Sequence, residues 1–93
     1  MKVLFYKNYV SKDLKGLSET DRKIFKNFID FVKLKNPPIT DPHISKLKGF
    51  ENVFRFKKIG KKIRIIFYME NDLIMIIGIS YRKEVYTKVL NRI

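Results

Sequence analysis

Six cationic side chains lie between positions 55 and 64 of this chain, with no acidic residue among them. They are Arg55, Lys57, Lys58, Lys61, Lys62 and Arg64. The apolar runs 53–57 and 63–68 that carry most of them predict two strands of a hairpin. Because successive side chains of a strand point to opposite faces, Arg55 and Lys57 should share a face opposite the two phenylalanines of their strand. Such concentrated positive charge repels itself unless an anion binds, and a phosphate backbone fits that role.

The basic and aromatic residues of this region suit phosphoryl chemistry that needs no metal. The candidates are Arg55, Lys57, Arg64, Tyr81, Arg82 and Tyr86. A guanidinium group can stabilise the charge that develops on a reacting phosphate, and an ammonium crowded by other cations can take part in proton transfer. A tyrosine can stack on a base. RNA carries its own nucleophile in the 2′-OH, so its cleavage depends mainly on alignment and charge neutralisation.

Other kinds of site are missing from the sequence. There is no Gly-rich phosphate loop, no Ser-His-Asp set and no cysteine. The single histidine, His43, follows a proline and is expected to be a solvent-facing loop residue. We therefore expect neither a metal site nor a cofactor.

Length and charge restrict the class of protein. The 93 residues suit a single domain, 1–93, and the net charge is +12. Nucleic acid, an anionic membrane surface or an acidic protein would each suit such a charge, and its clustering argues against a merely solvated lysine-rich surface. The apolar run at the start is too short for a signal peptide, and no segment is long enough to span a membrane. We expect a cytoplasmic protein that does not bind membranes.

The spacing of apolar residues predicts the elements that must position these side chains. A strand is expected over 3–6, a brief helix from Ser11 or Asp13 to Gly16, and an amphipathic helix over 19–35. Further segments are a proline-rich link at 36–42, strands over 53–57, 63–68 and 73–79 with turns near Gly60 and at 70–72, and a C-terminal helix within 83–93. The expected fold is α+β: a small antiparallel sheet of about four strands, with N-terminal helices packed on one side and a short C-terminal helix.

Four segments of the chain, taken in order, resemble the RelE/ParE superfamily of toxins from toxin–antitoxin modules. They are Lys46-Leu47-Lys48-Gly49, Phe54-Arg55-Phe56-Lys57, Ile63-Arg64-Ile65-Ile66-Phe67 and Tyr81-Arg82-Lys83-Glu84-Val85-Tyr86. The resemblance extends over nearly the whole chain in length and element order, and its specific part is 46–86.

The resemblance implies an mRNA interferase of the RelE branch, which cleaves mRNA in the ribosomal A site to leave a 2′,3′-cyclic phosphate and a 5′-OH. It implies mRNA, the ribosome and a cognate acidic antitoxin as partners. Arg55 and Lys57 match two basic strand positions, Lys57 being a candidate general base or charge stabiliser. Arg64 matches the arginine that binds the scissile phosphate. Arg82 matches a further arginine, and Tyr86 a tyrosine that orients the substrate.

Two positions depart from the family pattern. Tyr81 stands where many members have histidine, and Arg55 stands where some have lysine, although arginine is a poor proton acceptor. Both departures shift proton transfer toward Lys57 and Tyr86. Residues expected to bind RNA without taking part in chemistry are Lys46, Lys48, Lys58, Lys61, Lys62 and Tyr81.

Alternatives stand beside this hypothesis. The chain could be a ParE-like inhibitor of DNA gyrase or a basic RNA-binding module without catalytic activity. Arg64 could form an ion pair with Glu70 or Asp72 across the sheet, and Tyr86 could pack its ring under the C-terminal helix.

Overall fold

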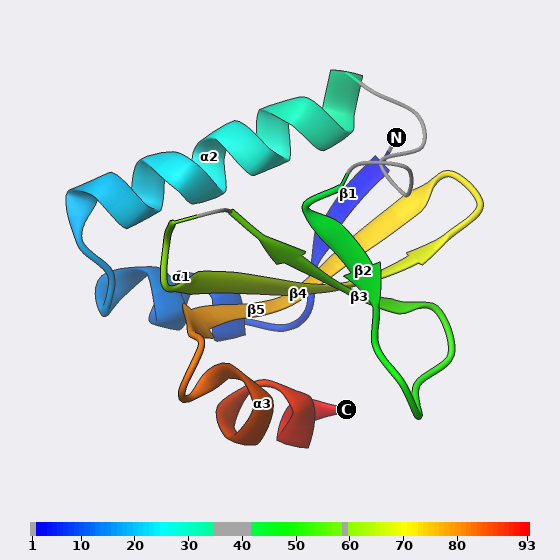
Figure 1. The fold of residues 1–93 in the computed structure, drawn as a ribbon. Helices are drawn as coiled ribbons and strands as arrows, with labels where there is room; N and C mark the ends of the chain where they lie inside the picture. The colour runs from blue at the N-terminus through cyan, green and yellow to red at the C-terminus, as the bar shows by residue number, and fades with distance from the viewer. Residues whose placement is uncertain (1, 35–41, 59) are drawn as a thin grey trace.

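The computed structural model describes residues 2–34, 42–58 and 60–93, which form one sheet with helices on both of its faces (Figure 1). The strands are β1 (Lys2–Phe5), β2 (Ile44–Lys46), β3 (Val53–Lys57), β4 (Ile63–Glu70) and β5 (Leu73–Tyr81). The helices are α1 (Tyr9–Lys15), α2 (Glu19–Leu34) and α3 (Val85–Lys88), the last followed by the 3₁₀ turn η2 (Leu90–Arg92).

The α+β class is confirmed, but the sheet differs from the expected one in two respects. Five strands lie in the order β1-β5-β4-β3-β2, and β1 runs parallel to β5, so the sheet is mixed. A parallel pair needs a long crossover, which the intervening chain supplies. The additional strand, β2, is a three-residue segment that pairs with β3. So short a strand depends on its partner and leaves little periodic pattern in the sequence.

The helices begin and end close to the predicted positions. In α2, the predicted apolar stripe is buried except for the half-buried Phe31. Before the helix, Ser18 Oγ accepts a hydrogen bond of 3.2 Å from the Asp21 N–H. The first helix begins at Tyr9, earlier than expected, and ends at Gly16 as expected. The proline-rich link predicted at 36–42 falls outside the described residues except for its last position.

Apolar side chains fill both sides of the sheet. On one side, α1, α2 and alternate residues of β3, β4 and β5 form the larger cluster, which includes Phe28, Phe54 and Phe67. On the other side, Ile66 and Ile77 pack against the C-terminal segment, 85–92, which comprises α3 and η2. That short segment covers only part of its face of the sheet, so side chains of β3 and β4 on this side can be polar (Figure 1).

Candidate nucleic-acid site

Arg64 lies on the α3 side of β4, between Lys57 of β3 and Ser80 of β5 in the strand register. Only 5% of the residue is exposed. Its Nη1 donates to the carbonyl oxygens of Lys61 and Ile63, at 2.8 Å each. These bonds to the backbone fix the guanidinium at the sheet surface without using a carboxylate.

No carboxylate pairs with Arg64 in the described part of the chain. Glu70 lies at the far end of β4 and accepts a hydrogen bond from the Tyr68 hydroxyl, while Asp72 lies in the turn that follows. The alternative that Arg64 is a structural ion-pair partner of either acid is therefore wrong.

The surroundings of Arg64 are electrostatically unfavourable for a cation. Burial lowers the pKa of the Arg64 guanidinium below its usual value. Tyr86 opposes this change, whereas the charges of Arg55 and Arg82 lower the pKa further. The free energy that this arrangement costs would be recovered by binding an anion beside Arg64.

An open pocket of about 420 Å³ lies next to this guanidinium. It is lined by Lys57, Gly60, Lys61, Lys62, Arg64 and Arg82. Gly60, with a φ of 78°, supplies the left-handed turn that joins β3 to β4. The N–H of Arg82 donates to the Lys62 carbonyl at 2.8 Å, which brings the end of β5 to the same turn. Five cations without an acidic neighbour in the lining suit a phosphate group.

Arg55 and Tyr86 form a second polar contact on the same face of the sheet. Arg55 Nη1 donates to the Tyr86 hydroxyl at 2.5 Å, and Nη2 donates to Ser45 Oγ at 3.2 Å. Its Nε is buried and has no hydrogen-bond partner in the described part of the structure. The hydrogen bonds of its two Nη atoms therefore hold the Arg55 guanidinium between β2 and Tyr86.

Tyr86 is 37% exposed, and its hydroxyl faces β3. It does not belong to either core cluster of the described residues. The alternative that Tyr86 packs its ring under the C-terminal helix is therefore wrong. Phe54 and Phe56 lie on the α2 side, which confirms the predicted alternation around Arg55.

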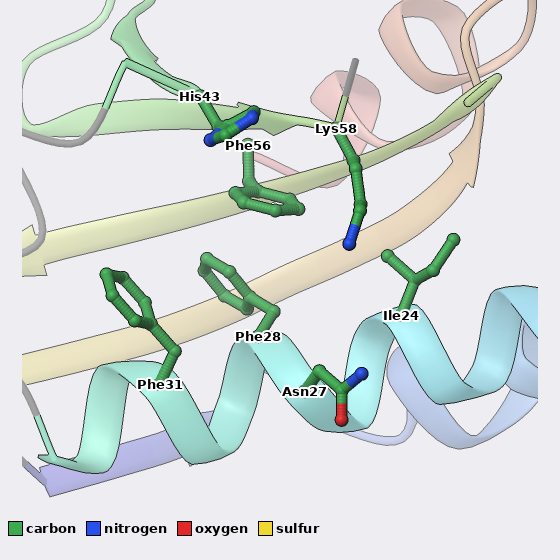
Figure 2. A pocket seen from close by; sticks show the side chains of 7 residues that line it. All are labelled: Ile24, Asn27, Phe28, Phe31, His43, Phe56 and Lys58. Atoms are coloured by element: carbon green, nitrogen blue, oxygen red, sulfur yellow. The ribbon is translucent and has the colours of Figure 1, made fainter. Parts of the chain in front are cut away.

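Four of the predicted RNA-binding residues lie away from this pocket. Lys58 lines a separate pocket of about 200 Å³ between α2 and β3 (Figure 2). Tyr81 packs against the core on that side of the sheet. Lys46 pairs with Phe54 in the register and so shares the α2 side, and Lys48 is exposed in the loop before β3. The structure therefore gathers Lys57, Lys61, Lys62, Arg64 and Arg82, with Arg55 and Tyr86 beside them, and separates the rest.

His43 also differs from expectation. It is half-buried and lines the same α2-side pocket, with its ring centroid 5.9 Å from that of Phe56 (Figure 2). His43 lies in a turn before β2, as the prediction of a loop residue requires, but the prediction that it faces solvent was wrong, because β2 brings it against an aromatic neighbour.

The roles of two polar residues in the structure were not found from the sequence. Ser45 contacts Arg55, but β2 left no signal that could place it there. Asp13 was interpreted as a helix start, yet it is a buried residue inside α1. A signal was present, since Val10, three positions earlier in α1, puts Asp13 on the buried face of the helix.

Within residues 2–34, 42–58 and 60–93, no group of three or more histidines or acidic residues could hold a metal ion. No helix among these residues is both long enough and apolar enough to cross a membrane.

No protein-family model matches the chain, but comparison with known proteins finds similar sequences and structures. It is 35% identical over 78 residues to RelE1 of Methanocaldococcus jannaschii, named as a proposed toxin, covering 83% of this chain and 86% of that protein. A structure of a RelB–RelE antitoxin–toxin complex from Methanococcus jannaschii is similar with a TM-score of 0.74 and 30% identity, covering 90% of this chain and 95% of that one. The isolated RelE toxin of E. coli, at 22% identity, shares the fold with a TM-score of 0.68, covering 98% and 96% of the two chains.

Proposed function

The chain belongs to the RelE family of toxins from toxin–antitoxin systems, and on this premise we propose that it is an endoribonuclease that cleaves mRNA without a resident metal. The observation that carries the proposal is the acid-free pocket in which the buried Arg64 is joined by Lys57 and Arg82. The scissile phosphate of the RNA would bind in this pocket.

The reaction requires only groups that the RNA and these side chains supply. The 2′-oxygen attacks the adjacent phosphorus, the bond from phosphorus to the 5′-oxygen breaks, and the products are a 2′,3′-cyclic phosphate and a 5′-OH. One proton leaves the 2′-OH and one reaches the departing 5′-oxygen, so the proton count balances. Arg64 and Arg82 would stabilise the extra negative charge on the phosphate oxygens in the transition state.

Lys57 is proposed as the group that takes part in proton transfer or stabilises charge. It is exposed and lines the same pocket as Arg64. Tyr86 is proposed to orient the nucleotide, because its ring is partly exposed while its hydroxyl is held by Arg55. A tyrosine fixed at its hydroxyl presents a ring face to a base at little entropic cost.

We also propose the ribosomal A site as the place of cleavage and a cognate acidic antitoxin as the inhibitor. A protein with a net charge of +12 is drawn to ribosomal RNA and to an acidic protein alike. The relative from Methanococcus jannaschii was solved together with RelB, which supports an antitoxin partner for this chain.

The test is to incubate the purified protein with mRNA, alone and on translating ribosomes, and to map the new RNA ends. We expect cuts on the ribosome that leave a 2′,3′-cyclic phosphate, and much slower cleavage by Arg64→Ala. The Lys26→Ala variant removes an exposed cation on the opposite side of the molecule and should cut as the parent does. Inhibition of DNA gyrase with intact mRNA would instead establish ParE-like activity, and RNA binding without cleavage would establish a non-catalytic module.

A further inference from the structure

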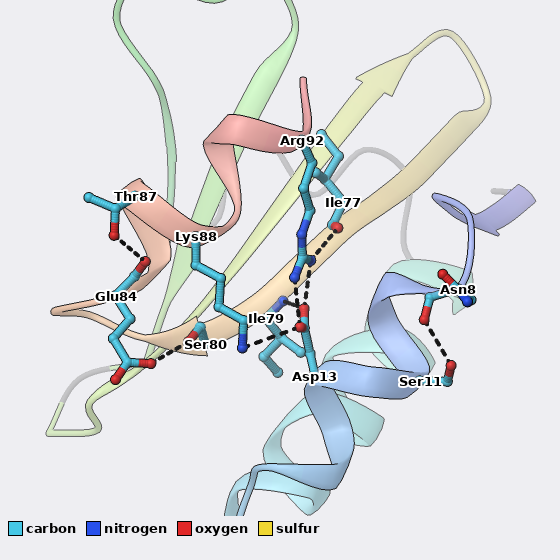
Figure 3. Close-up of polar contacts among 10 residues, drawn as sticks. All are labelled: Asn8, Ser11, Asp13, Ile77, Ile79, Ser80, Glu84, Thr87, Lys88 and Arg92. Carbon is cyan, nitrogen blue, oxygen red and sulfur yellow. Dashed lines mark hydrogen bonds and ion pairs between the residues drawn. The ribbon is translucent and has the colours of Figure 1, made fainter.

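Asp13 forms a buried ion pair that joins α1 to the C-terminal segment (Figure 3). Its side chain is 1% exposed, and each of its oxygens accepts a hydrogen bond of 2.8 Å from a different Nη atom of Arg92. The N–H of Ile79 donates to the same carboxylate at 3.0 Å, and the Lys88 ammonium lies 3.6 Å from it. A two-pronged contact of this kind fixes orientation as well as distance.

The carboxylate is charged in the folded protein. Burial raises the pKa of Asp13, but the hydrogen bonds from Arg92 and Ile79 and the charges of Arg92 and Lys88 lower it below the usual value. The pair is therefore an ionic contact and not a neutral hydrogen bond.

Arg92 is enclosed on its other sides as well. Its side chain is 9% exposed, its Nη1 donates to the Ile77 carbonyl at 3.1 Å, and its guanidinium carbon lies 4.3 Å from the centroid of the Tyr9 ring. It also lies directly over Gly78, where a Cβ atom would be only 2.3 Å from Nη1. The end of the chain is thus attached to both α1 and β5 through one side chain.

Tyr86 is carried by the same short segment. The fully buried Val85 and Val89 hold α3 on the sheet, while Lys88 and Arg92, four positions apart, contact α1. Tyr86 points away from α1 and toward β3, where its hydroxyl accepts a hydrogen bond from Arg55. A four-residue helix is not stable by itself, so its orientation depends on such tertiary contacts.

We infer that the Asp13–Arg92 pair is a positioning device that sets the rotation of α3 and thereby holds Tyr86 at Arg55 beside the basic pocket. The inference rests on the proposed function. Val85 and Val89 fix the distance of α3 from the sheet, but apolar contacts allow the helix some rotation about its own axis. The two-pronged contact of the Arg92 guanidinium with Asp13 does not allow this rotation. Asp13 and Arg92 are thus positioning residues, because they act on the reaction through Tyr86. Misplacing an orienting group by about 1 Å can cost as much as 10²-fold in rate.

The first test observes Tyr86 directly and needs no activity. The protein is labelled with 3-fluorotyrosine, and the Tyr86 resonance is assigned by its loss in Tyr86→Phe. We expect Asp13→Asn and the neutral pair Asp13→Asn with Arg92→Gln to move this resonance toward its position in Arg55→Ala. Unchanged Tyr68 and Tyr81 resonances would report an intact sheet. Glu19→Gln, the same change of charge at an exposed residue, should leave Tyr86 where it is.

The milder variant Arg92→Lys keeps the charge and loses the two-pronged contact, so it should fold and give a smaller shift in the same direction. An unmoved Tyr86 resonance in Arg92→Lys and in the neutral pair would overturn the inference. If the parent protein cuts no RNA, the proposed function fails, while the fluorine measurement still decides whether the pair positions Tyr86.

The second test separates positioning from general stability by kinetics at a temperature where every variant is folded. We expect Arg92→Lys to lower kcat about tenfold with KM unchanged. In a Tyr86→Ala background the same change should cause no further loss, because Tyr86 is the group through which the pair acts. If Arg92→Lys lowers kcat by the same factor in the parent and in the Tyr86→Ala background, the inference is overturned.

Discussion

At the scale of the residue, Arg64 combines burial, fixed orientation and the absence of an acidic partner in its described surroundings. Two backbone carbonyls hold its Nη1, and two further arginines lower its pKa together with burial. An arginine remains protonated at neutral pH in spite of such a change. A charge that is held in place and partly removed from water interacts strongly with a phosphate.

Arg64→Ala should therefore reduce the rate of mRNA cleavage by roughly 10²–10³, because Arg64 is proposed, together with Arg82, to stabilise the charge of the transition state. Ribosome binding should change little, because several other cations contribute to it. Single-turnover cleavage and ribosome co-sedimentation measure the two quantities. A parental cleavage rate would show that the phosphate does not react beside Arg64.

Lys57 allows the two roles proposed for it to be separated. Lys57→Ala should lose activity about as severely as Arg64→Ala, by roughly 10² or more. Lys57→Arg keeps the positive charge but removes a practical proton acceptor, so retained activity would indicate charge stabilisation alone. Cleavage rates measured across a pH series distinguish the outcomes, because Lys57→Arg should lose any pH dependence of the rate that is caused by Lys57.

At the scale of the element, the contact between the C-terminal segment and β5 depends on the absence of a side chain at Gly78. A Cβ atom at Gly78 would lie 2.3 Å from Arg92 Nη1 and 2.9 Å from the methyl groups of Val89. Gly78→Ala should destabilise the protein by about 1–3 kcal/mol through overpacking. Gly16→Ala is the matched control, because its Cβ would meet the Asp13 carbonyl at an ordinary 3.6 Å. Urea unfolding of both variants tests this, and equal stabilities would contradict it.

The ion pair that joins α1 to the C-terminal segment should make stability depend on pH. Because the pKa of Asp13 is lowered below its usual value of 3.8, its contribution is fully present above that value and is lost as the pH falls through the folded-state pKa. Unfolding free energies from urea curves should thus fall in acid more steeply for the parent than for Asp13→Asn. A difference between the two proteins that stays constant with pH would contradict this.

At the scale of the whole molecule, cations of the described residues lie on both faces of the sheet. The pocket cations lie on the α3 side, whereas Lys58 lies on the α2 side and Lys46 shares that side by register. Charge on both sides draws the protein to an anionic partner, and the pocket side presents Arg64, which is fixed to the sheet by two backbone carbonyls. Long-range attraction and local recognition are therefore carried by different residues.

This division predicts unequal effects of removing lysines in pairs. Replacing Lys61 and Lys62 by alanine should weaken RNA binding and reduce its salt dependence by about 0.7 in log–log slope for each lost phosphate contact. Replacing Lys46 and Lys48, which lie away from the pocket, removes the same number of charges. This change should alter the slope of RNA binding against salt less. Binding titrations at several salt concentrations measure both, and equal slopes for the two double variants would show that the pocket does not direct binding.

The sequence by itself determined the α+β class, the extent of α2, the hairpin, and the position of Arg55 on the face of its strand opposite Phe54 and Phe56. Each of these follows from local periodicity, which reports which face of an element is buried. The motifs around Arg64 and Tyr86 also pointed to the family to which the chain belongs. The roles of these residues in cleavage remain predictions.

Only the tertiary structure decided which candidates lie together. Lys57 and Lys58 are neighbours in sequence, yet they line pockets on opposite sides of the sheet, and Tyr81 packs on the side opposite Arg64. The parallel pairing of β1 with β5 and the Asp13–Arg92 pair across 79 positions escaped prediction, because they join segments far apart in the chain and no local pattern of side chains encodes such a contact. The strand β2 escaped prediction because its three residues are too few to show a period.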